Sequence, residues 1–118
     1  MKLLTAQEIN TLVSGIGLDY AYYQFPEGTE QPTPFICFYI SNSNDMGADN
    51  SNYCKIRQLV IELYTDNKDY EKEAAVETAL TNAGLVYQTE ETYLDSERMY
   101  MVAYTAQIIF TEVSNNGE

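Results

Sequence analysis

The chain has 118 residues, with 18 acidic and 6 basic side chains and a formal net charge of −12. This length and a hydrophobic fraction of 45% predict a single domain over residues 1–118 and exclude wholesale disorder. The charge disfavours direct binding to nucleic acid or to an anionic membrane, since both require a basic surface. Two interpretations of the charge stay open: simple solubility, and a surface that repels passing DNA.

The N-terminal region predicts a short amphipathic helix over residues 5–14. Thr5-Ala6-Gln7-Glu8 is a capping box, in which the Thr5 hydroxyl accepts from the Glu8 amide and the Glu8 carboxylate accepts from the Thr5 amide. Two glycines, Gly15 and Gly17, are expected to end the helix. The apolar positions recur at helical spacing, at Ile9, Leu12, Val13 and Ile16.

Two predicted strands and two loops follow this helix. Residues 20–25 are rich in aromatic side chains, and residues 35–40 form a continuous apolar run that suits a strand buried on both faces. Residues 26–34 contain glycine and prolines and therefore indicate a loop. Residues 41–52 form a long polar loop, and loops of this length in compact domains are usually functional.

Residues 53–65 predict the clearest strand, because side chains alternate along it. The expected core set is Leu59, Ile61 and Leu63, and the opposite set is Val60, Glu62 and Tyr64. Asp66 opens a second predicted helix, and Gly84 ends it. The buried stripe of that helix is predicted to be Val76, Ala79, Leu80 and Ala83.

The C-terminal region predicts a hairpin. Residues 85–87 begin a further strand, and residues 92–94 pair with residues 99–110 around a turn at residues 95–97. Both faces of the last strand are apolar, so one is expected to pack on the core and the other on a neighbouring subunit. The elements together predict an α+β fold in the order αβββαββ. Short connections favour a mainly antiparallel sheet of four to five strands, with two helices packed on one face.

The N-terminal residues and the cysteines indicate the compartment. Met1-Lys2-Leu3-Leu4 turns polar at once, so no signal peptide is expected, and no run approaches the roughly 18 apolar residues of a membrane span. Cys37 and Cys54 both fall in predicted strands, where buried free thiols are the default in a reducing cytosol and a disulfide is the alternative. We expect a soluble protein made in the cytoplasm.

The sequence offers little for catalysis. It contains no histidine, which removes the commonest general base and most zinc sites with histidine ligands. No Walker A loop or dinucleotide-binding glycine motif is present. Acidic side chains cluster at residues 66–73 and 90–97, and in so acidic a chain we interpret such clusters as solvated surface. We expect no enzyme activity, no cofactor and no metal.

Two segments carry polar side chains that could serve a ligand or a partner. Residues 42–47 resemble a calcium loop, but Met46 occupies a ligand position and Tyr53 stands where a bidentate glutamate is needed. Lys55 and Arg57 share a face of the third predicted strand. They either neutralise nearby acids or pair with an acidic patch of the next copy of the chain.

Several short motifs lie in a characteristic order along roughly residues 20–105. They are Ala48-Asp49-Asn50 with Tyr53, Ile61-Glu62-Leu63-Tyr64-Thr65-Asp66 with Lys68-Asp69, the second predicted helix, Glu91-Thr92-Tyr93, Ser96-Glu97 and Met99-Tyr100. In these motifs the chain resembles a family of small proteins from tailed phages and prophages of Gram-positive bacteria. It departs from that family at Met46-Gly47, where a bulkier aromatic is expected, and at Cys54, and these departures concern the loop contacts more than the fold.

The resemblance implies a tail terminator or head–tail joining protein, a structural component of the virion in the tail or neck. It implies a ring of six copies that caps the tail tube and receives the filled head. The implied partners are other copies of the chain, the major tail tube protein and the head-completion protein. DNA would pass through the ring without specific binding, and no membrane is involved.

The residues expected at subunit contacts come from the polar loop, the basic pair and the tyrosines. They are Asp45, Met46, Asp49, Asn50, Tyr53, Lys55, Arg57, Tyr64, Tyr93, Tyr100 and Tyr104. Two alternatives to the terminator role stay open. One is a head-completion or neck component, and the other is an acidic DNA mimic that inhibits a host enzyme.

Overall fold

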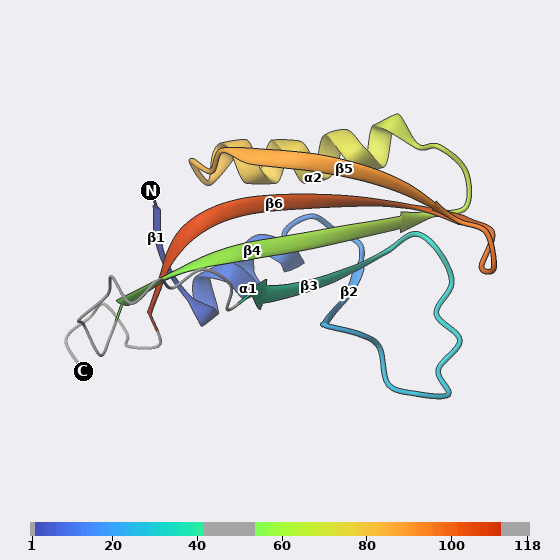
Figure 1. The fold of residues 1–118 in the computed structure, drawn as a ribbon, viewed down its shortest axis with the longest axis horizontal. Coiled ribbons are helices and arrows are strands. Elements are labelled where there is room, and N and C mark those ends of the chain that lie inside the picture. Colours follow the sequence, from blue (N-terminus) through green and yellow to red (C-terminus); the bar gives the residue numbers. More distant parts are fainter. Residues whose placement is uncertain (1, 42–53, 112–118) are drawn as a thin grey trace.

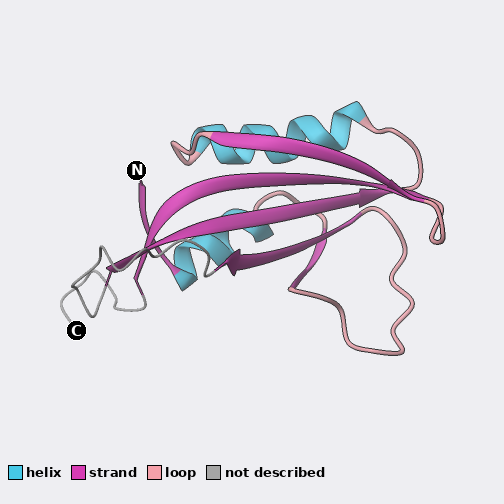
Figure 2. Ribbon diagram, viewed as in Figure 1, coloured by secondary structure: helices cyan, strands magenta, loops and turns pink. Residues whose placement is uncertain are grey.

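The computed structural model describes residues 2–41 and 54–111, which form a sheet with two helices (Figures 1 and 2). None of the helices in these ranges is long and apolar enough to cross a membrane. The elements, in chain order, are β1 (Lys2–Thr5), α1 (Ala6–Ser14), β2 (Asp19–Tyr22), β3 (Phe35–Ser41), β4 (Cys54–Thr65), α2 (Tyr70–Asn82), β5 (Tyr87–Leu94) and β6 (Met99–Thr111).

The sheet has six strands and is mixed. Its path runs β1-β6-β4-β3-β2, and β5 also pairs with β6. The β4–β6 pair is the long antiparallel centre, whose register runs from Cys54 opposite Thr111 to Thr65 opposite Tyr100. β1 and β5 follow one another along the other edge of β6, β5 antiparallel to it and β1 parallel to it (Figure 1).

The predicted topology was wrong in two respects. The expected order αβββαββ omitted β1, and the sheet is not mainly antiparallel with four to five strands, because both β1–β6 and β2–β3 are parallel pairs. The four residues of β1 are too few for a visible alternation, and their partner strand lies at the other end of the chain. β2 and β3 are parallel because residues 23–34 carry the chain back along the sheet before β3 begins, as a parallel connection requires.

Local signals set the ends of both helices. In α1 the Thr5 amide donates to Glu8 Oε1 at 2.9 Å and the Glu8 amide donates to Thr5 Oγ1 at 3.1 Å, which confirms the predicted capping box. α2 begins later than the predicted Asp66, because Asp69 is its N-cap and accepts from the Lys72 amide at 3.1 Å. Gly84 follows α2 with a φ of 79°, in the left-handed region that suits glycine.

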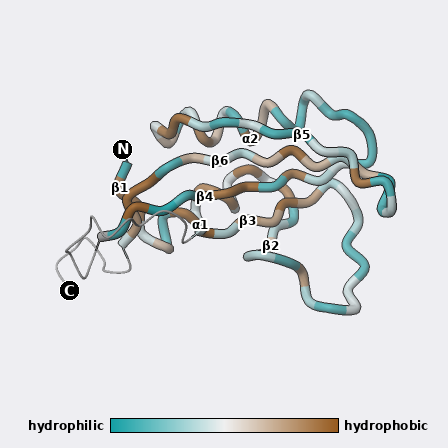
Figure 3. Tube along the Cα trace, in the orientation of Figure 1, coloured by the Kyte–Doolittle hydropathy of each residue, from teal (hydrophilic) through white to brown (hydrophobic). Residues whose placement is uncertain are grey.

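The core lies between the helices and one face of the sheet. In β3, β4 and β6 most of the buried residues fall on the helix side of each strand, and the register places them opposite one another; Cys37 and Val60 are buried on the other side. Figure 3 shows the most hydrophobic stretches of the trace in these strands. The core residues from the helices are Ile9, Val13, Val76 and Leu80, and those from these strands are Ile36, Phe38, Leu59, Ile61, Leu63, Val102, Tyr104, Ala106 and Ile108.

Tyr104 joins the sheet to α2 inside this core. Its side chain is 1% exposed, and its hydroxyl donates to Glu77 Oε2 at 3.1 Å and to the Glu73 carbonyl at 3.4 Å. Burial, followed by the hydrogen bond and charge of Glu77, raises the pKa of the Tyr104 hydroxyl. The hydroxyl therefore stays protonated and keeps donating to the helix.

Candidate subunit interface

The sheet face opposite the helices is the candidate interface, and we call it the open face. It consists of the side chains that alternate with the core residues along each strand. Its members along the central part of the sheet are Asp19 and Ala21 of β2, Phe35, Cys37 and Tyr39 of β3, Gln58, Val60, Glu62 and Tyr64 of β4, Gln88, Glu90 and Thr92 of β5, and Met101, Ala103, Thr105 and Gln107 of β6.

The open face is poor in charge and carries only one sign. Its charged members are Asp19, Glu62 and Glu90, and none of its described members is a cation. The solvated face of an antiparallel sheet is normally polar, whereas the core of a protein interface is depleted of charge and enriched in aromatic residues and methionine. In composition the open face matches an interface better than a solvated surface.

An aromatic cluster covers the β3 and β4 part of the open face. The Phe35 ring stacks on Tyr64, with centroids 4.7 Å apart and an interplanar angle of 16°. Two rings from the segment after β2 reach the same place, Phe25 edge-on to Phe35 at 5.4 Å and Tyr23 edge-on to Tyr39 at 5.8 Å. Tyr23 adopts a φ of 72°, and its amide donates to the Phe38 carbonyl at 2.7 Å, so the chain leaves β2 at that residue.

Glu62 lies among these rings, half-buried in the middle of β4. The Tyr64 hydroxyl donates to Glu62 Oε1 at 2.8 Å, and the Tyr39 hydroxyl interacts with the same carboxylate. Burial, together with the charge and hydrogen bonds of Glu62, raises the pKa of both tyrosines. Beside them Cys37 is 6% exposed, and burial followed by the charge of Glu62 raises its pKa to about 11.

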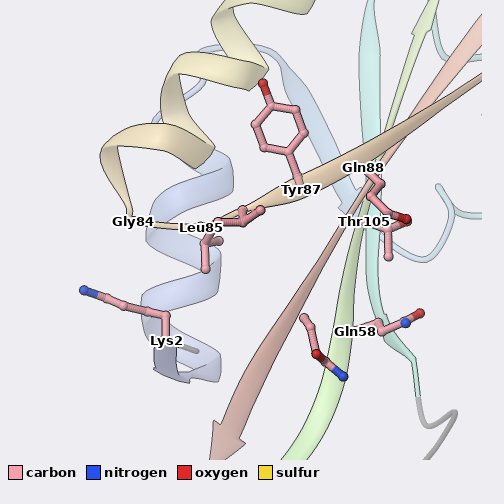
Figure 4. A pocket seen from close by; sticks show the side chains of 9 residues that line it. Lys2, Gln58, Gly84, Leu85, Tyr87, Gln88 and Thr105 are labelled. Carbon is pink, nitrogen blue, oxygen red and sulfur yellow. The ribbon is translucent and has the colours of Figure 1, made fainter.

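A groove of about 580 Å³ opens at the edge of the open face that is farther from the aromatic cluster, where β1 and β5 leave a gap along β6. Figure 4 shows Gln58, Gln88 and Thr105 gathered there from three different strands. Beside the groove Val86 is 87% exposed. The lining offers side-chain amides, the hydroxyls of Tyr87 and Thr105 and the Lys2 ammonium, so it can form hydrogen bonds with a partner. The lining residues are Lys2, Gln58, Gly84, Leu85, Val86, Tyr87, Gln88, Thr105 and Gln107.

Apart from Glu90, the acidic clusters expected from the sequence lie away from the open face, and ion pairs join part of them. Lys68 Nζ lies 2.8 Å from Glu73 Oε2 and 2.6 Å from Glu91 Oε1, so it links the start of α2 to β5. The two carboxylates raise the pKa of Lys68. Within residues 2–41 and 54–111, no three histidine, cysteine, aspartate or glutamate side chains are grouped to hold a metal ion.

The residues expected at contacts are scattered by the fold. Asp45, Met46, Asp49, Asn50 and Tyr53 lie outside the described residues. Only Tyr64 of the remainder belongs to the open face, and Tyr104 lies in the core. Tyr93 is 47% exposed at the far end of β5, edge-on to Tyr100 at 4.9 Å.

The basic pair lies on the helix side of β4. By its register Lys55 shares that side with Arg57, and Lys55 is exposed. Arg57 is 8% exposed, and its Nη1 donates to the Ile56 carbonyl at 3.0 Å. Sequence reasoning missed Phe35, Tyr39 and Glu62 as a group. The alternation of residues 60, 62 and 64 was visible, but their pairing with β3 was not.

Comparison with solved structures shows a likeness of fold. The chain matches no protein-family model and no curated protein sequence. Among solved structures it resembles a chain from the virion of a native gene transfer agent particle, with a TM-score of 0.52 and 15% identity. The match covers 83% of this chain and 84% of that chain. At this identity the likeness establishes a shared fold.

Proposed function

We propose that the chain is a structural, non-enzymatic protein of a phage-like virion. In this proposal it forms a ring that ends the tail tube and joins the tail to the head. The observation that carries the proposal is the fold, shared over most of both chains with a component of a gene transfer agent virion. The motif resemblance to phage tail proteins supports the same class of function independently of the fold.

The open face supports an assembly role. Subunits that close into a ring use a heterologous interface, in which one surface patch meets a different patch on the next copy. The open face suits such a contact because its only charges are carboxylates, which would repel each other if two open faces met around a twofold axis. Its partner surface must therefore be a different one.

The net charge supports a passage for DNA. A ring of six copies carries six times −12, or −72. Such a ring would repel the phosphate backbone, so DNA could move through it without sticking. A structure of the ring with a basic channel would contradict this part of the proposal.

The first test is assembly in solution. Light scattering after gel filtration should report a ring of the purified chain, either alone or after addition of tail tube protein, and negative-stain images should show rings on tube ends. Thr105→Glu, on the open face, should abolish rings. The matched variant Thr78→Glu, on an exposed position of α2, should keep them. A chain that stays monomeric alone and with tube protein would refute the proposal.

The second test is a deletion in the phage. Overlong tails indicate a terminator, whereas tails of normal length that fail to join heads indicate the neighbouring neck component. Normal virions would refute both roles. A pull-down with defined candidate partners distinguishes a terminator from an acidic DNA mimic. A mimic should retain a basic host enzyme, whereas a terminator should retain tail tube protein.

A further inference from the structure

We propose that Glu62, with Tyr39 and Tyr64 beside it, forms a guanidinium-binding site, and that its occupant is Arg98 of a second copy of this chain. The inference rests on the proposed ring and identifies one of its contacts. It assigns the open face of one copy to the β5–β6 turn of the next.

The receiving side is a carboxylate that lacks a cation. The ion pairs seen among the described residues join Lys68 to Glu73 and Glu91, and none involves Glu62. An ionised carboxylate accepts about four hydrogen bonds, and the tyrosine hydroxyls leave part of this capacity unused. A half-buried carboxylate is stabilised when a cation completes its contacts.

The surroundings of Glu62 favour arginine over lysine. The stacked Phe35–Tyr64 pair and the Tyr23–Tyr39 pair place aromatic rings on the same part of the sheet. A guanidinium is planar, binds a carboxylate through two parallel hydrogen bonds and stacks on aromatic faces, whereas an ammonium is a strongly hydrated point charge. Because both tyrosine hydroxyls stay protonated, they remain hydrogen-bond donors and add no negative charge of their own.

The donor side is the turn between β5 and β6. The chain has two arginines, and Arg57 is buried and bonded to its own strand. Arg98 is exposed, with a φ of 56°, and its amide donates to the Leu94 carbonyl at 2.7 Å and the Asp95 carbonyl at 3.3 Å. These bonds hold the turn, while the Arg98 guanidinium makes no ion pair among the described residues. The fold therefore presents this side chain at one end of the sheet.

The two groups cannot meet within one copy. Glu62 lies opposite Ala103, five residues along β6 from Arg98, which corresponds to about 17 Å along the sheet. A contact between the turn of one copy and the open face of the next is heterologous, as a ring requires. It also supplies the cation that the open face itself lacks.

The test is a double-mutant cycle on the ring, using light scattering or sedimentation to measure its dissociation constant. Arg98→Gln and Glu62→Gln should each raise that constant by about 30-fold or more. The dissociation constant of the double variant should be no higher than that of the single variant with the larger loss. Arg98→Lys should recover only part of the loss. The matched controls are Lys72→Gln, which removes a cation from α2, and Glu71→Gln, which removes an exposed carboxylate from the same helix; both should leave the dissociation constant unchanged.

Circular dichroism and thermal unfolding check that each variant is folded. Should Glu62→Gln fail to fold, competition replaces it: argininamide should dissociate the wild-type ring at lower concentration than lysinamide. If the wild type forms rings and Arg98→Gln leaves their dissociation constant unchanged, this inference is overturned and the proposed function is not. Additive losses in the double variant also overturn the inference. A wild-type chain that forms no ring refutes the proposed function, and this contact with it.

Discussion

Cys37 shows how the open face shapes the chemistry of a single side chain. The thiol lies beside Glu62 in a strand that no helix covers on that side, yet it is 6% exposed. Burial and the nearby carboxylate both disfavour the thiolate, so the group is inert toward the alkylating and oxidising chemistry that requires it. Its role is to fill space between larger rings.

The raised pKa of Cys37 predicts a loss of stability in alkali. The ordinary thiol value is 9.0 and the folded value about 11, so the folded state holds the proton more tightly than the unfolded state. The contribution is complete below pH 9 and is lost as the pH rises toward 11, by on the order of 2 kcal/mol in the free energy of unfolding.

Urea unfolding of the Cys54→Ala variant, which retains Cys37, and of the double variant Cys37→Ala/Cys54→Ala measures this contribution. The Ala variant should be less stable by about 1 kcal/mol at pH 7, because it leaves a small cavity. The gap should then close and reverse between pH 9 and 11, because the loss of about 2 kcal/mol in the protein with Cys37 exceeds the initial difference. Tyr39 and Tyr64 titrate in both proteins, so they cancel in the comparison. A gap that stays constant over this range contradicts the assigned cause.

At the scale of elements, the two helices are held by different devices. α1 follows β1 directly, and Thr5 is at once the last strand residue, opposite Thr111, and the N-cap of the helix. α2 depends instead on Asp69 at its N-terminus and on Lys68, which ties it to β5. The junction at Thr5 therefore couples the edge of the sheet to the first helix.

Thr5→Ala should lower the free energy of unfolding by about 1 kcal/mol, because the Glu8 amide loses its acceptor at the start of α1. The matched control is Thr11→Ala, an exposed position in the same helix, which should be neutral or slightly stabilising because alanine has the higher helix propensity. Equal losses in the two variants, measured by urea unfolding, would show that the cap is not the cause.

At the scale of the whole molecule, charge opposes folding and assembly. A net charge of −12 on a 13.4 kDa chain raises the energy of any compact state through repulsion between the carboxylates. The same repulsion acts between copies in a ring. The open face keeps few of these charges, so contacts there add less repulsion than contacts through α2 would.

Salt should therefore stabilise the chain. Raising NaCl from about 10 mM to about 150 mM shortens the screening length from about 30 Å to about 8 Å. We expect a rise of about 4 °C in the melting temperature, corresponding to about 1 kcal/mol. Lys68→Gln should gain more than the wild type, since screening no longer weakens the Lys68 pairs. A melting temperature that falls with salt in both proteins would contradict this account.

The sequence by itself determined the features that depend on neighbours along the chain. The capping box at Thr5, the glycine after α2 and the alternation in β4 act over a few residues, so their patterns are readable in one dimension. The same alternation correctly separated Leu59, Ile61 and Leu63, which are buried in the core, from the opposite set.

Only the tertiary structure decided the sheet order and the open face. The strand β1 exists because β6, more than a hundred residues later, supplies its hydrogen bonds, and parallel pairing leaves no mark on so short a segment. The group of Phe35, Tyr39, Glu62 and Tyr64 likewise depends on the register between β3 and β4. A register shift of one residue would turn these side chains to the other face, so local pattern could not reveal which residues share a surface.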